Sequence, residues 1–224
     1  MASLRSATEP SDGSAAAQHL ALVADAGLAQ HRHLAALLDG AGVHTGRDLA
    51  DAVHLLCSLH GRHPGVIQLA RAQGAEPAAK AWLATAADGF EAERLLVVKL
   101  TAAVGPMPST PAAGATEAGL ASQRHALEML AGSERRGCAL GAATALVRDW
   151  TTIRGLLDLA ATRTGVEPPA MMLSDPQSVA DVVARCADSA VAERAIRFGA
   201  EQLLLQHRAL FDLLEARASA RGDW

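Results

Sequence analysis

The chain has 224 residues, carries a formal net charge of −4 and is half hydrophobic, with 3% aromatic residues and no tyrosine. Its longest basic run is the pair Arg135 and Arg136. Nucleic-acid-binding proteins usually carry a larger basic patch, so this charge pattern excludes nucleic acid as the expected partner. Alanine and leucine supply most of the apolar content, and both favour helices, so the composition predicts an all-α protein.

The chain shows no sign of export or membrane insertion. Its three cysteines, Cys57, Cys138 and Cys186, are an odd number at wide spacing and form no disulfide framework. Residues 1–15 contain acids and lack the apolar centre of a signal peptide. The longest strongly apolar window without charge, residues 137–147, is shorter than the roughly 20 residues of a membrane span. We therefore expect a cytoplasmic protein with no membrane partner.

Four helices are predicted in the first half of the chain. A flexible tail covers residues 1–15 and a first helix covers 16–39, where glycines at 40 and 42 end it. The next helices are predicted over residues 47–60, 64–74 and 77–104, the last beginning with a proline that suits the first turn of a helix.

The second half contains two clear loops, residues 105–114 and 164–178. Between them lies a long helical stretch, 116–161, with a bend expected at Gly132 or Gly137 and another near Trp150. After the second loop, Asp175 followed by proline is a typical helix start, and helices follow to residue 217 with a break near 188–189. Short loops between helices indicate antiparallel neighbours. The expected fold is one antiparallel bundle, residues 16–220, of roughly six to eight helices, two of them long.

One phrase occurs at both ends of the chain: QHRHLAALLD at residues 30–39 and QHRALFDLLE at 206–215. If both copies are helical, His31 and His207 each take the place of a leucine in an apolar stripe, so both are predicted to point inward. Two interpretations stay open. The first is an internal duplication with two histidines facing each other in the core. The second is chance recurrence in a chain rich in alanine, leucine and arginine.

Two acids also interrupt predicted apolar stripes. Glu93 and Glu134 fall on the apolar faces of their helices, which makes them, with His31 and His207, the candidate polar core. Inward Glu and His residues bear a loose analogy to ferritin-like bundles. However, a di-iron bundle takes a Glu-x-x-His pair from each of two helices, and the chain contains none. We expect the two acids to pair with Arg or His, and we expect no metal or cofactor.

A weaker metal candidate lies at the end of the predicted helix 47–60. Zinc accepts cysteine and histidine ligands, and Cys57, His60 and His63 lie within seven residues. The alternative is an ordinary helix end, with Cys57 as a small buried residue and His60 near the negative end of the helix dipole.

No complete catalytic motif is present: the chain has no phosphate-binding glycine loop and no GxSxG nucleophile elbow. We therefore expect a non-catalytic helical-bundle protein that acts as a scaffold, through an unknown protein partner or through self-association. One alternative is a degenerate ferritin-like metal or redox protein using inward Glu and His. A second is a small-molecule-binding bundle with an apolar pocket.

Three phrases carry a resemblance: LCSLHGRHPGVI, SERRGCALGAATALVRDW and GAEQLLLQHRALFDLLEARA. They resemble an uncharacterised family of short all-helical bacterial proteins, a domain of unknown function. The resemblance covers most of the chain after residue 17. It implies a helical fold and a bacterial source, and it implies no activity.

Overall fold

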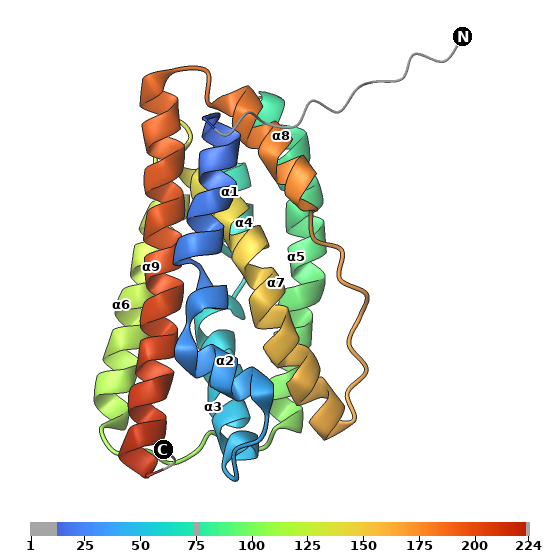
Figure 1. Ribbon diagram of the computed structural model, residues 1–224, viewed down its shortest axis with the longest axis vertical. Coiled ribbons are helices and arrows are strands. Elements are labelled where there is room, and N and C mark those ends of the chain that lie inside the picture. Colours follow the sequence, from blue (N-terminus) through green and yellow to red (C-terminus); the bar gives the residue numbers. More distant parts are fainter. Residues whose placement is uncertain (1–12, 74–76, 223–224) are drawn as a thin grey trace.

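The computed structural model describes residues 13–73 and 77–222, and in these ranges the chain is all-α with no strand (Figure 1). The all-α prediction is therefore confirmed. The elements in chain order are α1 (Ala15–Ala26), the 3-10 turn η1 (Leu28–Gln30), α2 (Arg32–Asp39), α3 (Thr45–His60), α4 (Val66–Ala72), α5 (Pro77–Ala103), α6 (Ala113–Ala131), α7 (Cys138–Thr164), α8 (Pro176–Cys186) and α9 (Ala190–Arg221).

The described residues form nine α-helices where the sequence predicted six to eight, because two predicted helices are divided. The first predicted helix is interrupted at Gly27. The amide of the next residue, Leu28, donates to the side chain of Asp149 and not to a carbonyl of the preceding turn. The long middle stretch ends at Ala131 and restarts at Cys138, after Gly137 with a φ of 92°. Three helices, α5, α7 and α9, have 27 residues or more, where the sequence predicted two long ones.

Several helix ends follow local signals in the sequence. The Asp175 side chain accepts a hydrogen bond from the amide of Ser178, 2.8 Å away, and proline occupies the first turn of α8. The break predicted near residues 188–189 is present, and Ser189 caps α9 by accepting from the amide of Ala192 at 3.2 Å. Gly40 ends α2 in the left-handed conformation. The side chains of Asp175 and Ser189 thus satisfy backbone amides that helix starts leave unpaired.

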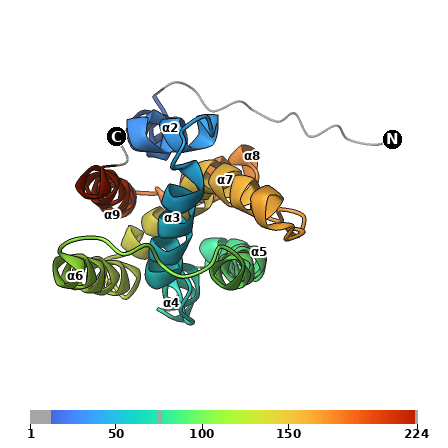
Figure 2. The ribbon, with the colours of Figure 1, turned by 90° about the horizontal axis from the view of Figure 1, so that it is seen from below.

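Helix α7 is the centre of the fold, since it contacts every other helix that the structure describes. Seen along the bundle, α3 and α7 lie between the outer helices α5, α6 and α9 (Figure 2). Helices α7 and α9 approach most closely at Gly141 and Gly199. A Cβ atom at either glycine would overlap a backbone carbonyl of the opposite helix, that of Ile196 or Cys138. The absence of a side chain at these two positions therefore permits the crossing.

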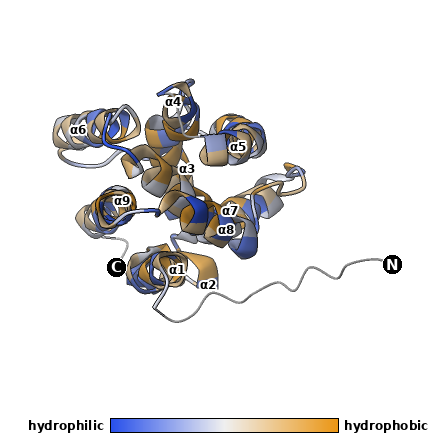
Figure 3. Cartoon of the chain, turned by 90° about the horizontal axis from the view of Figure 1, so that it is seen from above, coloured by the Kyte–Doolittle hydropathy of each residue, from blue (hydrophilic) through white to orange (hydrophobic). Residues whose placement is uncertain are grey.

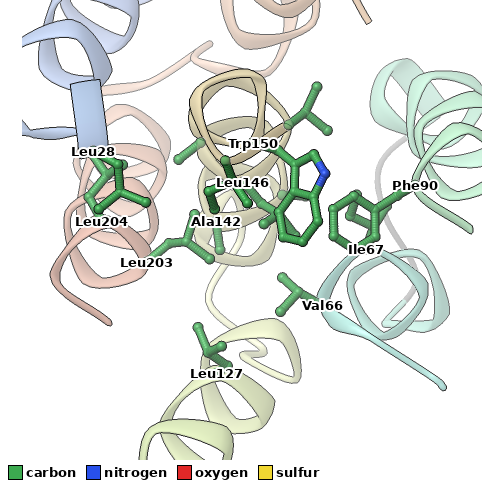
Figure 4. Close-up of a cluster of buried hydrophobic side chains, with 14 of the residues drawn as sticks. Leu28, Val66, Ile67, Phe90, Leu127, Ala142, Leu146, Trp150, Leu203 and Leu204 are labelled. Atoms are coloured by element: carbon green, nitrogen blue, oxygen red, sulfur yellow. The ribbon is translucent and has the colours of Figure 1, made fainter. Parts of the chain in front are cut away.

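The labelled helices carry hydrophobic and hydrophilic residues together (Figure 3), as expected of helices with one buried face. Trp150 of α7 lies in the core beside Phe90 of α5 (Figure 4), with ring centroids 4.7 Å apart and planes at 69°. Edge-to-face geometry of this kind is favoured between aromatic rings. Within residues 13–73 and 77–222, none of the helices combines the length and the apolar character that crossing a membrane requires.

Candidate functional site

Three buried polar side chains from three helices meet in the core. His207 of α9 places its Nδ1 2.6 Å from Oδ2 of Asp149 on α7. Its other ring nitrogen, Nε2, lies 3.1 Å from Nε2 of His60 on α3. His207 has no exposed surface, and Asp149 and His60 are almost fully buried. The resulting chain, Asp149–His207–His60, joins α7, α9 and α3.

The hydrogen-bond partners determine where the ring protons lie. Because a carboxylate only accepts, Nδ1 of His207 donates to Asp149. The other oxygen of Asp149 accepts from the amide of Leu28 at 2.7 Å. Burial, and then the neighbouring His207, hold the pKa of His60 well below its usual value, so His60 is neutral. Between the two rings, one Nε2 donates a hydrogen and the other Nε2 accepts it.

A second group of buried polar side chains lies beside His60 and is centred on Glu93. The His60 ring stands edge-on to Trp150, with centroids 5.3 Å apart. Trp150 Nε1 donates to Oε2 of Glu93 at 3.1 Å, and Arg154 NH1 donates to Oε1 of Glu93 at 2.5 Å. Burial raises the pKa of Glu93, while the hydrogen bonds from Trp150 and Arg154 lower it. Glu93 is thus an inward acid paired with arginine.

Arg154 extends this group to the surface. Its Nε donates to Asp158 at 2.7 Å, and NH2 donates to the carbonyl oxygen of Pro169 at 2.6 Å. Pro169 lies in the connection between α7 and α8. The guanidinium therefore ties this long connection to the core acid of α5.

A third polar group joins the first turns of α3 to the last turns of α9. The sequence analysis did not predict it. Asp51, with no exposed surface, accepts from both Nε and NH2 of Arg217, each at 2.8 Å. Arg221 donates to the same carboxylate and to Asp48, each at 2.6 Å. Bidentate arginine–carboxylate contacts are among the strongest hydrogen bonds in proteins. Asp51 lies between buried residues of α3, so a search for acids inside apolar stripes would have found it.

The two histidines of the repeated phrase are both buried, but they have different partners. His31 is not helical: it precedes α2 in an extended conformation. Its Nε2 lies 3.1 Å from the carboxylate of Asp212, and its ring lies 5.8 Å from that of Phe211. His207 instead bonds Asp149 and His60. The first copy of the phrase therefore forms a turn and a short helix, and the second lies inside one long helix.

The predicted inward position of Glu134 is wrong. The residue is exposed and lies between the end of α6 and the start of α7. The sequence pattern treated residues 116–161 as one helix, which placed Glu134 in register with Leu127. Because α6 ends at Ala131, that register does not extend to Glu134.

The three weak zinc candidates point in different directions. His60 enters the core and bonds His207, whereas Cys57 is half-buried and His63 is exposed, 3.7 Å from Glu91. Burial raises the pKa of the Cys57 thiol, which favours the protonated form over the thiolate that binds metal. In the described parts of the chain, no three His, Cys, Asp or Glu side chains are grouped so that they could hold a metal ion.

Access to the core histidines is narrow. His60 lines a pocket of about 30 Å³ beside Arg124 and Leu127. A volume of this size holds about one water molecule. Asp149, His207 and His60 could pass a proton along their hydrogen bonds, but no organic substrate fits beside them. We interpret the three side chains as a connection between helices. The other candidate site is an apolar surface of the bundle.

The outer face of α9 carries such a surface. Val191, Phe198 and Leu205 recur every seven residues and are 65%, 42% and 54% exposed. Beside them lies a groove of about 220 Å³ between α6 and α9, lined by Phe198, Met129 and Gln202 among others. The Arg135 guanidinium lies over the Phe198 ring, 5.6 Å from its centroid. We call Val191, Phe198 and Leu205 the α9 stripe.

Comparison with known proteins identifies one relationship. The model of a family described as a family of unknown function, DUF6975, matches residues 23–222. No curated protein and no solved structure matches the chain.

Proposed function

The chain belongs to this family of unknown function, DUF6975, and we propose that it is a non-catalytic binding protein that associates with a second copy of itself. The contact is made by the α9 stripe. One observation carries the proposal: a helix whose inner face forms the core also exposes apolar side chains at a seven-residue spacing.

The spacing matters because residues seven apart lie on one face of a helix, as in coiled coils. Single exposed apolar residues are ordinary, but three on one helix face beside an apolar groove favour an interaction site. Met129 of α6, 64% exposed, lies across the groove and widens the apolar surface. Both helices lie on the same side of the bundle (Figure 2), so one partner helix could cover both.

Charge complementarity favours a second copy as that partner. Arg194 and Asp212 are exposed residues of α9, 18 positions apart, which is five turns of helix. They therefore lie on one face, on either side of Phe198 and Leu205. An antiparallel two-fold arrangement would place each Arg194 beside Asp212 of the partner subunit. Such self-complementary contacts are what a two-fold dimer requires.

Both charges are accessible for this contact. Arg194 has no ion pair with any residue that the structure describes. Asp212 contacts His31 with one oxygen, but its side chain is 71% exposed. In the paired arrangement, Phe198 and Leu205 lie between the two charge pairs, so apolar contact forms the centre and charged residues form the edge.

The proposal also places the protein in the cytoplasm. Cys57, Cys138 and Cys186 are free thiols, which suits a reducing compartment. The net charge of −4 supports a protein rather than a nucleic acid as partner.

The test is the native mass of the full chain, measured by size-exclusion chromatography with light scattering over a range of concentrations. We expect a dimer for the natural chain and a monomer for Phe198→Glu and Leu205→Glu. Leu95→Glu is the matched control, because Leu95 is 53% exposed on α5, on the other side of the bundle (Figure 2). It should remain dimeric.

Charge exchange tests the antiparallel arrangement. Arg194→Asp alone places like charges together and should weaken the dimer. Adding Asp212→Arg restores opposite charges and should recover it. A monomeric natural chain at tens of micromolar contradicts self-association, as does a dimer unaffected by both stripe variants. If adding Asp212→Arg to Arg194→Asp does not restore the dimer, the antiparallel pairing is contradicted.

A further inference from the structure

A cavity of about 510 Å³ lies at the end of the bundle where α1, the end of α8 and the first turns of α9 meet. We infer that it binds a small molecule with an apolar body and a polar end that carries both a positive and a negative charge. This site lies beside the α9 stripe and shares Arg194 with the proposed dimer contact. His19 takes no part in that contact, so binding measured in His19→Leu tests the cavity independently of self-association.

The first argument is His19 of α1, which forms part of the cavity wall. His19 is only 4% exposed, and neither ring nitrogen has a hydrogen-bond partner. Buried polar groups without partners are rare and call for an explanation. His31, His60 and His207, which are also buried, each have at least one partner. A ligand in the adjacent cavity would supply what His19 lacks.

The protonation state of His19 defines what that ligand must offer. Burial lowers the pKa of His19 to about 4, so the ring is neutral near pH 7. A neutral imidazole has one donor and one acceptor nitrogen. Both nitrogens are shielded from solvent, so binding includes a rotation of the ring that turns a nitrogen toward the cavity. A ligand with donor and acceptor groups satisfies either tautomer.

The apolar part of the cavity wall indicates that the ligand has an apolar body. Leu22 of α1 and Ile196 of α9 line the cavity, together with alanines of α1 and Ala187 after α8. Small-molecule sites typically enclose several hundred Å³, with mostly apolar walls and few polar groups. The cavity has a volume in this range, and its wall is divided between apolar side chains and a few charged or polar ones.

The remaining lining residues explain the charged end. Asp25 and Glu193 supply carboxylates, and neither has an ion pair with a described residue. Arg194 supplies a guanidinium, whereas the neighbouring Arg197 is occupied by Glu201 at 2.7 Å. A ligand ammonium suits the two acids and a ligand carboxylate suits Arg194. An apolar amino acid combines these features with a body that fits Leu22 and Ile196.

The experiment titrates the full chain with L-phenylalanine, followed by amide chemical shifts and calorimetry. Two analogues carry one charge each: phenethylamine has only the amine and 3-phenylpropanoate only the carboxylate. We expect phenylalanine to shift amides of α1 and of the start of α9. Each analogue should bind at least ~10-fold more weakly, the loss of about one charge-assisted contact.

His19→Leu tests the role of the imidazole. The substitution keeps an apolar side chain of similar size and removes two unsatisfied nitrogens, so the fold should persist. We expect phenylalanine affinity to fall at least ~10-fold, while His125→Leu, at an exposed position of α6, changes nothing. Absence of binding at millimolar phenylalanine, or binding unchanged in His19→Leu, overturns the site. Equal affinity for an analogue with a single charge overturns the ligand class.

Discussion

The imidazole of His207 bonds the carboxylate of Asp149 at 2.6 Å, although 58 positions separate the two residues in the chain. The bond bridges α7 and α9, about two helical turns after Gly141 and Gly199, where the two helices approach most closely. Asp149 also accepts from the amide of Leu28, where the first predicted helix is interrupted. One carboxylate thus links three segments of the fold.

Removing the His207 side chain should destabilise the protein without preventing folding. In His207→Ala, Asp149 keeps the Leu28 amide but loses its other donor, and His60 loses its partner. We expect the free energy of unfolding to fall by about 1–3 kcal/mol, measured by urea denaturation. His125→Ala removes an exposed histidine and should change stability by no more than about 0.5 kcal/mol. Equal effects of the two substitutions would contradict the assigned role.

Glu93 and Glu134 looked equivalent in the sequence and should behave very differently. Glu93→Ala leaves Arg154 and Trp150 Nε1 buried without their acceptor, so we expect a loss of about 3–5 kcal/mol. Glu134→Ala changes an exposed residue and should cost no more than about 0.5 kcal/mol. Thermal or urea unfolding of both variants decides the matter. A large loss for Glu134→Ala would mean that the connection from α6 to α7 is wrongly placed.

The close crossing of α7 and α9 makes Gly199 intolerant of a side chain. In Gly199→Ala, the new Cβ would overlap the carbonyl oxygen of Cys138, and we expect a loss of about 1–3 kcal/mol or more from overpacking. Gly119→Ala is the control, because nothing lies within 4 Å of a Cβ there. That helical position should gain up to about 1 kcal/mol. If Gly199→Ala leaves the free energy of unfolding unchanged, α7 and α9 must lie further apart at this position.

Stability should decrease as the solution becomes acidic, partly through His19. Its pKa is lowered from 6.5 to about 4, so between these values the unfolded chain binds a proton that the folded protein does not. The stabilisation is therefore complete above pH 6.5 and is lost as pH falls toward 4. This one group contributes at most about 3 kcal/mol.

Urea unfolding of the natural chain and of His19→Leu, between pH 4 and 7.5, isolates that contribution. Carboxylates also titrate in this range. The contribution of His19 is therefore the difference between the two proteins in how steeply the free energy of unfolding changes with pH. We expect the variant to show the shallower dependence on pH. Identical slopes would show that folding does not lower the pKa of His19.

Local signals predicted the helices well because they act within a few residues. Asp175 and the following proline predicted the start of α8, and glycine predicted the end of α2. The interruption at Gly27 escaped this reasoning, because the acceptor for the next amide is Asp149, which lies far away in the chain. Glu134 was misplaced for a related reason: its register depended on a helix that ends three residues earlier.

The sequence by itself determined an all-helical chain and the burial of His207 and Glu93. His31 is buried as predicted, but as an extended residue before α2 and not as part of a helical stripe. Spacing along a helix sets which side chains share a face, and apolar faces are driven out of water. Only the tertiary structure decided which side chain each of them meets: Asp212 for His31, Asp149 and His60 for His207, and Arg154 and Trp150 for Glu93. A hydrogen bond depends on distances of about 3 Å between particular atoms. Which helices lie side by side determines those distances, and periodicity along one helix carries no information about its neighbour.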